Sequence, residues 1–297
     1  EQCDIRWPLQ GKHGDRPVRI IGNPVVGQPH GDWHGDLPRL AGNYDLVITH
    51  CDLWNQWQRV RKLRACRIVN WVIGDHSPVP APHRMLISSP TFVKAVPMSR
   101  WFERELRKCP QIDSDKVAHA IGHGVDPEVF YPSPNPEINR PKGCDFLIVT
   151  VASNTGHREN LPEMIEAYSI FLKETGANAF FYIHDFAQSV SGYNLYNVCQ
   201  MCEELYGVEL WGKIGFKQQL SLPDSFMRDL YTKADCHLMT IQQGSFEIPI
   251  IEAGSCSTPT ITTGNTPMAE LVGDGERGLI VPPVAPIWAN LTSSRQW

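Results

Sequence analysis

Short apolar runs alternate with amphipathic segments along most of the chain. The runs are rich in β-branched residues, as in buried strands, whereas the longer segments have the apolar spacing of helices. Strands are predicted at Val18–Gly22, Asp45–Thr49, Arg67–Ile73, Val93–Met98, Lys116–Ile121, Asp145–Ala152, Ala179–His184, Val208–Trp211, Asp235–Met239, Thr258–Thr262 and Gly278–Val281. Helices are predicted over residues 53–64, after Ser99, from the capping-box-like Asn160-x-x-Glu163 to Gly176, over Tyr193–Tyr206 and over Pro223–Lys233. Residues 23–43 are rich in Gly, Pro and Asp, which indicates a loop.

This alternation predicts an α/β fold whose parallel sheets are built from right-handed βαβ units. The segment Tyr131–Lys142 holds four prolines and is interpreted as an extended linker. It divides the chain into two Rossmann-like domains that face a cleft, at residues 1–134 and 142–283, with a tail at 284–297. Ligands of such sheets bind beyond the carboxyl ends of the strands.

The stretch Gln243–Glu270 is the most informative part of the second domain. Ser245 is expected to cap a helix, and Pro249 suits its first turn. The free backbone N–H groups and the positive dipole end of that helix favour a bound phosphate. Glu252, early in the helix, can accept hydrogen bonds from ribose hydroxyl groups. The alternative interpretation is an ordinary strand–helix–strand unit whose Gly244 only allows a turn.

Composition narrows the class of protein. Of 297 residues, 42% are hydrophobic and 20% charged, as in a soluble globular protein. A net charge of −5 and a pI near 6.1 argue against a nucleic-acid partner. No apolar run is long enough to cross a bilayer and no signal peptide is visible, so a cytoplasmic location is expected. The chain begins with Glu1, which leaves open that its ends are trimmed.

The nine cysteines are scattered, and Cys199-x-x-Cys202 is the one close pair. It lies in a predicted helix without a second pair at zinc-site spacing. Structural thiols are the favoured interpretation, and a metal or redox role is the alternative.

A series of motifs runs in order from about Val93 to Pro283, most densely over residues 121–283. Together they resemble the signatures of retaining, GT-B-fold glycosyltransferases of family 4. The motifs are Gly122–Pro132, Arg158–Leu161 with Ile165–Tyr168, Leu230-Tyr231-x-x-Ala234-Asp235, Phe246-x-x-Pro249-x-x-Glu252-Ala253, Thr258-Pro259, Pro267-x-Ala269-Glu270 and Gly275-x-x-Gly278.

The resemblance implies a hexosyltransferase-type enzyme that moves a sugar from a nucleotide diphosphate sugar to an acceptor hydroxyl. It implies no cofactor and no metal, because a helix dipole and basic side chains replace the metal. The acceptor would be a sugar, a lipid-linked group or a protein, and peripheral membrane contact and the oligomeric state stay open. The family's glycine-rich N-terminal loop and long C-terminal helix have no counterpart here, so the first domain is expected to be reduced.

The resemblance also assigns roles to residues of the second domain. The second of the family's paired glutamates, which holds the ribose, falls on Glu252. The first, near the donor sugar, falls on Gly244, so this contact is either lost or moved to Glu247, three residues later, where glycine is usual. Glu247 joins Asp75 and His76 as a candidate catalytic residue. The backbone from Gly244 through Ser245 and Phe246 to Glu247 would hold the diphosphate. Gly212 and Lys213, after a predicted strand, would lie beside the base.

The basic pair that neutralises the leaving diphosphate falls on Asn154 and Glu159. Three interpretations are open. The adjacent Arg158 can replace the missing basic pair, the donor can be different from that of the family, or the enzyme can be inactive.

In the first domain, Asp75 and His76 follow a buried strand where the family often places a His or Asp that faces the donor sugar. A loop Asp and His at a strand end is the alternative, and His50 ends a neighbouring strand. Two other functions remain. One is a degenerate protein that binds a nucleotide or sugar without turnover, or that serves as the partner subunit of an active transferase. The other is a sugar epimerase that uses His76 and Glu247.

Overall fold

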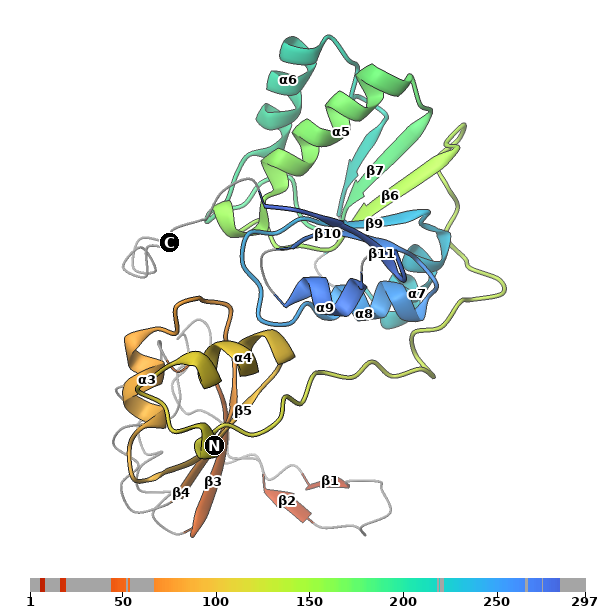
Figure 1. Ribbon diagram of the computed structural model, residues 1–297. Coiled ribbons are helices and arrows are strands. Elements are labelled where there is room, and N and C mark those ends of the chain that lie inside the picture. The colour runs from red at the N-terminus through yellow and green to blue at the C-terminus, as the bar shows by residue number, and fades with distance from the viewer. Residues whose placement is uncertain are drawn as a thin grey trace.

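In the computed structural model, the described residues are 6–8, 17–19, 44–51, 53, 67–217, 219, 222–264, 267–273 and 275–283. The predicted loop at 23–43, most of the predicted helix at 53–64 and the tail at 284–297 lie outside these ranges. Figure 1 shows two α/β units, each a parallel sheet with its helices. They are called here the first layer, around the strands β3 to β5, and the second layer, around the strands β6 to β11. No helix in the described ranges is both long and apolar enough to cross a membrane.

The second layer is a six-stranded sheet with the order β11-β10-β9-β6-β7-β8. Every neighbouring pair is parallel, so all the carboxyl ends meet at one edge. Helices α5 and α6 cover one face, and α7, α8 and α9 lie at the other (Figure 1). The strands are β6 Phe146–Thr150, β7 Ala179–Ile183, β8 Ile214–Phe216, β9 Cys236–Met239, β10 Thr260–Thr263 and β11 Gly278–Val281. The helices are η2 His157–Glu159, α5 Leu161–Thr175, α6 Leu195–Tyr206, α7 Asp224–Lys233, α8 Ile248–Ser255 and α9 Met268–Val272.

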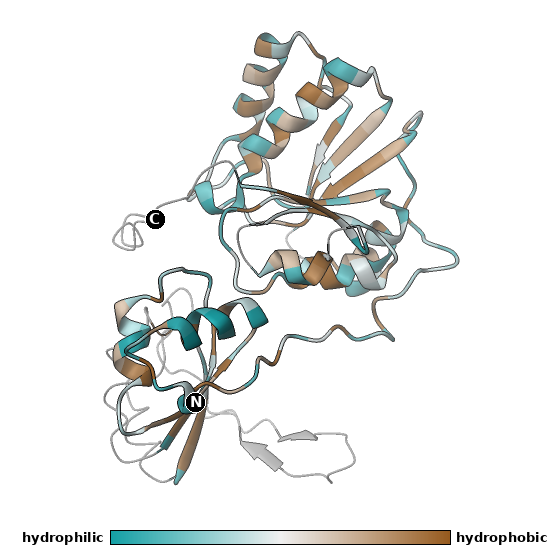
Figure 2. Cartoon of the chain, viewed as in Figure 1, coloured by the Kyte–Doolittle hydropathy of each residue, from teal (hydrophilic) through white to brown (hydrophobic). Residues whose placement is uncertain are grey.

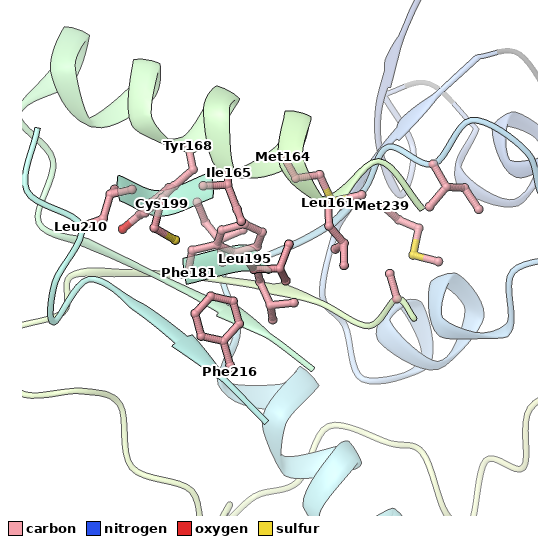
Figure 3. Packing of buried hydrophobic residues seen from close by; sticks show 14 of the residues in the cluster. Leu161, Met164, Ile165, Tyr168, Phe181, Leu195, Cys199, Leu210, Phe216 and Met239 are labelled. Atoms are coloured by element: carbon pink, nitrogen blue, oxygen red, sulfur yellow. The ribbon is translucent and has the colours of Figure 1, made fainter. Parts of the chain in front are cut away.

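Successive side chains of β6 point to opposite faces of the sheet, and this explains the two hydrophobic cores, one on each face. Ile148 packs with the α5 and α6 side chains, whereas Leu147 and Val149 pack with Leu230 of α7. In Figure 3, Leu161, Met164, Ile165 and Tyr168 of α5 lie over Phe181. Strands β6 and β7 are accordingly hydrophobic along most of their length, and helix α5 carries both hydrophobic and polar residues (Figure 2).

The first layer is a parallel sheet with the order β3-β4-β5. Its core joins Leu53, Ile68 and Val72 to Phe102 and Leu106. The elements are β3 Leu46–Cys51, β4 Arg67–Val72, α3 Ala81–Ile87, β5 Phe92–Pro97, α4 Arg100–Lys108 and η1 Ser114–Lys116, and β1 Arg6–Pro8 pairs with β2 Pro17–Arg19 in a separate antiparallel ribbon.

Most predicted strands and helices are present within a few residues, but two strands are wrong. Val208–Trp211 is not a strand, because Gly212 turns the chain with a φ of 76° and β8 begins after the turn. Lys116–Ile121 is not a strand, because Lys116 ends η1 and the segment after it makes one isolated bridge, Ala95 to Val117, rather than a strand ladder. Ser99 caps α4 as predicted, by accepting from Phe102 N–H at 3.1 Å.

Two predicted caps are also wrong. Glu247, not Ser245, precedes α8, and it makes no side-chain cap bond. Asn160 adopts a left-handed conformation and makes no capping box, because its amide instead donates to Thr240 O at 2.9 Å. Helices α3 and α9 have no counterpart in the sequence prediction.

The proline-rich segment is extended, and it is anchored to α7. The Arg228 guanidinium lies 4.9 Å from the ring of Tyr131, and Glu137 N–H donates to Asp229 Oδ2 at 2.8 Å. Arg140 pairs with Asp235 at 2.7 Å. Because Phe130 also packs with α7 and α8, the chain from residue 130 onward is attached to the second sheet.

Asp229→Ala removes the buried carboxylate that accepts from Glu137 N–H and pairs with Arg228. We expect the free energy of unfolding to fall by about 1–3 kcal/mol, since a buried N–H and a charge lose their partner. Denaturant titration measures it. Glu174→Ala, at an exposed position of α5, should change it by less than about 0.5 kcal/mol. Equal effects of the two substitutions would contradict the anchoring.

Candidate active site

The carboxyl edge of the six-stranded sheet collects most of the predicted site residues. The loop after β6 carries Asn154 and Arg158, and the loop after β9 carries Gly244 and Glu247. Because these two strands are neighbours, their loops lie side by side, and Gln242 N–H donates to Arg158 O at 2.9 Å. The edge is therefore an assembled site in the place where ligands of parallel sheets bind.

Gly244 and Glu247 share one volume. A Cβ atom at position 244 would overlap Glu247 Oε1 and would lie 2.9 Å from Ile241 Cδ1. The Glu247 carboxylate thus occupies the space that a side chain at position 244 would take. A larger residue at 244 would require the Glu247 side chain to move, and no unusual backbone angle is involved.

The Glu247 carboxylate is the most perturbed acid of this edge. Burial raises its pKa to about 7, the charges of Glu159 and Asp75 act in the same direction, and Arg158 opposes them. Burial likewise raises the pKa of Glu159. Asp75 comes from the first layer, so a charge of that layer acts on Glu247. A carboxyl that titrates near neutrality in such a place is typical of acid–base sites.

Asp75 and His76 follow β4, and their side chains pair with each other. Beneath them, His83 of α3 lies near both residues, and its Nε2 donates to Ile73 O at 3.2 Å. Burial lowers the pKa of His83 to about 4, so this ring is neutral at pH 7 and its Nε2 carries the proton toward Ile73 O. The loop that carries Asp75 is therefore held from below by a buried imidazole.

Glu252 lies one turn into α8 and faces α7. The Tyr231 hydroxyl donates to Glu252 Oε2 at 3.1 Å, and Tyr231 is fully buried. Burial raises the pKa of Glu252, whereas the bond from Tyr231 lowers it. This carboxylate is positioned by a rigid neighbour and remains partly accessible.

Asn154 has a structural role. Its amide donates to Tyr193 O at 2.8 Å and accepts from Tyr193 N–H at 2.8 Å, and the residue is 1% exposed. Gly192 is required here because a Cβ at that position would overlap Asn154. Asn154 thus fixes the loop after β7 and does not present a charge to the edge.

Arg158 is the basic residue that the loop after β6 presents. Its guanidinium pairs with Glu159, and the side chain is 52% exposed. Beside it, His157 Nδ1 lies 2.5 Å from the Tyr193 hydroxyl. Glu159 is buried, so the position that the family pattern gives to lysine holds an acid that fixes Arg158.

Phe246 packs toward the first layer. Its ring meets His123 edge-on at 5.0 Å, and a Cβ at Gly122 would lie 2.8 Å from the Phe246 ring. His123 in turn packs on Trp71 at 4.6 Å, and Trp71 packs on His50 at 4.8 Å. Ser245 is half-buried between Gly244 and Phe246.

A second contact joins the two layers at the N-terminus of α4. The Glu270 carboxylate accepts from Arg100 N–H at 2.9 Å and from Trp101 N–H at 3.0 Å. A carboxylate at the positive end of a helix is favourable by charge as well as by hydrogen bonding. The Pro267-x-Ala269-Glu270 motif indicated this residue, but its partner is 170 positions away along the chain.

Gly212 and Lys213 do not join the edge. They precede β8, at the amino ends of the strands, so the reasoning that placed them beside the base does not hold. Lys217 is the basic residue that follows β8, and its ammonium group lies 5.8 Å from the ring of Phe186. Correct placement of β8 in the sequence would have indicated Lys217.

Cys199 and Cys202 are buried free thiols, and burial raises the pKa of Cys199 to about 12. Within the described ranges, no group of three His, Cys, Asp or Glu side chains is arranged to hold a metal ion.

Glu247→Gln tests the environment of this carboxyl. A pKa raised from 4.5 to about 7 means that the folded state holds the proton more tightly than the unfolded state. Stability of the wild type therefore falls as pH rises through this window, and the variant, which cannot ionise, avoids that loss. We expect the variant to gain about 1–3 kcal/mol relative to wild type at pH 8.5 and nothing comparable at pH 4. Denaturant titrations at both pH values measure it, and a gain that does not change with pH would contradict the assignment.

Comparison with known structures identifies the fold. The chain aligns with sucrose-phosphate synthase from Thermosynechococcus elongatus at a TM-score of 0.63 and 18% identity, over 82% of this chain and 62% of that one. It aligns with a glycosyltransferase from Rickettsia africae at a TM-score of 0.62 and 17% identity, over 91% of this chain and 72% of that one. It aligns with HepE from Anabaena in complex with UDP and glucose at a TM-score of 0.62 and 14% identity, over 84% of this chain and 67% of that one.

These likenesses show the GT-B type of α/β fold with parallel sheets, as predicted from the sequence. The chain spans less than two thirds of the length of the synthase. A search of curated proteins finds no match. Residues 136–289, more than half of the chain, match the family described as Glycosyl transferases group 1, and the chain therefore belongs to that family.

Proposed function

We propose that this transferase is a retaining hexosyltransferase that moves a sugar from a nucleotide diphosphate sugar to an acceptor hydroxyl. One observation carries the proposal: the Glu247 carboxylate fills the space of the missing side chain at position 244. The family pattern puts its donor-sugar glutamate at that position. Glu247 thus brings a carboxylate next to the backbone of the position where the family pattern has its donor-sugar glutamate.

The donor binds across the carboxyl edge of the second sheet. Glu252, held by Tyr231, accepts the ribose hydroxyls. The backbone N–H groups from Gly244 to Glu247 and the N-terminus of α8 hold the diphosphate, since free amides and a helix dipole favour anions. Crystals of the structural relative HepE contain UDP-glucose, so uridine nucleotides are the first donors to test.

Breaking the bond between the sugar and the diphosphate builds negative charge on the leaving oxygen. Arg158 lies in the loop next to Gly244 and is exposed, so it can approach that oxygen. Preorganised positive charge at this point lowers the barrier by a few kcal/mol. Helix dipole and guanidinium together make a metal unnecessary in this proposal.

Positive charge develops at the same time on the sugar ring. Glu247 and Asp75 place two carboxyl groups near each other, one from each layer. An ionised carboxylate stabilises an oxocarbenium-like centre. His76, paired with Asp75, can exchange a proton with the acceptor hydroxyl or the departing group.

A protein that binds the nucleotide sugar without turnover is the second candidate. Asn154 favours it, because that residue faces inward where the family pattern has arginine. The two functions differ in turnover and agree in donor binding, so one set of variants separates them.

The test uses the purified chain with UDP-, GDP- and ADP-sugars, and measures release of nucleoside diphosphate and, by calorimetry, its binding. Glu252→Ala should weaken binding about tenfold to a hundredfold, as expected for a lost bond to a carboxylate. Glu247→Gln should bind normally and turn over about 10²- to 10³-fold more slowly. Glu174→Ala is the control and should change neither quantity.

Binding that depends on Glu252 without turnover of any donor would establish the binding protein instead. Loss of binding in Glu247→Gln together with unchanged turnover per bound donor would remove Glu247 from the reaction. Absence of nucleotide binding in the wild type would overturn both candidates.

A further inference from the structure

A cavity of about 370 Å³ lies beside strand β8, at the end of the six-stranded sheet. Its floor is the buried core: Cys199, Leu210 and Phe216 all line it, and Figure 3 shows them in the same packed cluster. Its volume lies in the range of about 300–1,000 Å³ that is usual for ligand pockets. The reaction proposed above uses none of its lining residues.

Two aromatic side chains stand at this cavity with much of their surface in solvent. Trp211 is 76% exposed and Tyr196 is 42% exposed. Tyr196 meets Phe216 edge-on at 5.3 Å, which fixes its ring against the floor. Aromatic rings that line a cavity offer apolar faces on which a ligand can stack.

The backbone that carries Trp211 is rigid. Lys213 N–H donates to Leu210 O at 2.9 Å, which closes a turn around Trp211 and Gly212. Glu203 Oε1 accepts from Leu210 N–H at 2.7 Å and from Trp211 N–H at 3.2 Å. The turn that puts an indole at the rim is therefore held by three hydrogen bonds, although the indole itself is exposed.

The polar lining comes from one helix. Asn197, Gln200 and Glu203 of α6 face the cavity, and the Gln200 amide is oriented by donating to Glu204 at 3.0 Å. Planar amides and a carboxylate can donate to and accept from neighbouring hydroxyl groups. Aromatic faces beside such groups suit a molecule with apolar C–H faces and a hydroxylated edge.

Charge narrows the class of ligand. Glu203 lines the cavity, and Glu204 and Glu209 are close to it along the chain. These carboxylates oppose phosphates, nucleotides, nucleic acid and anionic lipid. A neutral ligand with many hydroxyl groups meets no such repulsion.

We propose that this cavity is a second carbohydrate site, which binds a neutral oligosaccharide by stacking sugar rings on Trp211 and Tyr196. It is distinct from the donor site proposed above, because Arg158, Gly244, Glu247 and Glu252 are not among the residues that line it. The inference does not depend on turnover of a nucleotide sugar. It holds equally for an active transferase and for a protein that only binds a donor.

The experiment measures binding of maltotriose, cellotriose and N,N′,N″-triacetylchitotriose to the purified full chain by calorimetry. We expect at least one trisaccharide to bind with a dissociation constant in the millimolar range or tighter, roughly 4 kcal/mol or more. Trp211→Ala should weaken that binding about tenfold or more, and Gln200→Ala should weaken it as well. Met201→Ala is the matched control, since Met201 is an exposed apolar residue of α6 outside the lining.

Thermal unfolding of each variant separates loss of the site from loss of the fold. UDP binding at the carboxyl edge should be unchanged in Trp211→Ala, which keeps this test separate from that of the proposed function. Failure of all three sugars to bind, or equal affinity in wild type and Trp211→Ala, would overturn the proposal. Sedimentation gives the rival outcome: a wild-type dimer that Trp211→Ala dissociates, without sugar binding, would make this face a contact between two copies of the chain.

Discussion

The Glu270 carboxylate determines how the two layers meet. It belongs to α9 of the second layer, and it completes the N-terminus of α4 in the first by accepting from Arg100 N–H and Trp101 N–H. Both oxygen atoms are used, so the carboxylate fixes a direction as well as a distance. The stack from Phe246 through His123 to Trp71 adds a second point of contact. Two separate contacts restrain rotation, and the proximity of Asp75 to Glu247 depends on that restraint.

Two separate parts of the second sheet carry the two proposed binding sites: the carboxyl ends of its strands and the outer strand β8. The carboxyl ends gather Arg158, Gly244 and Glu247 from loops of neighbouring strands, where a nucleotide sugar is proposed to bind. Strand β8, at the end of the sheet, forms one wall of the cavity with α6. The proposed donor site and the proposed glycan site share no residue.

Local periodicity predicted most of the strands and helices, because burial on both faces makes each strand of a parallel sheet apolar. It failed where a distant partner decides the structure. Val208–Trp211 has the composition of a strand, but Glu203 and Gly212 turn it away from the ladder. The family pattern aligns Asn154 with an arginine, but the partner that holds Asn154, Tyr193, lies 39 residues later in the chain. The sequence leaves open that Glu247 replaces the missing glutamate, whereas its overlap with position 244 is a property of the folded chain.

The shared volume of Gly244 and Glu247 also constrains how this sequence can change. A glutamate restored at 244 while Glu247 is present would put two side chains, and two negative charges, into one space. The two positions are therefore coupled, and the effect of a substitution at one depends on the residue at the other. A glutamate at 244 therefore fits only where the Glu247 side chain moves or is replaced by a smaller one.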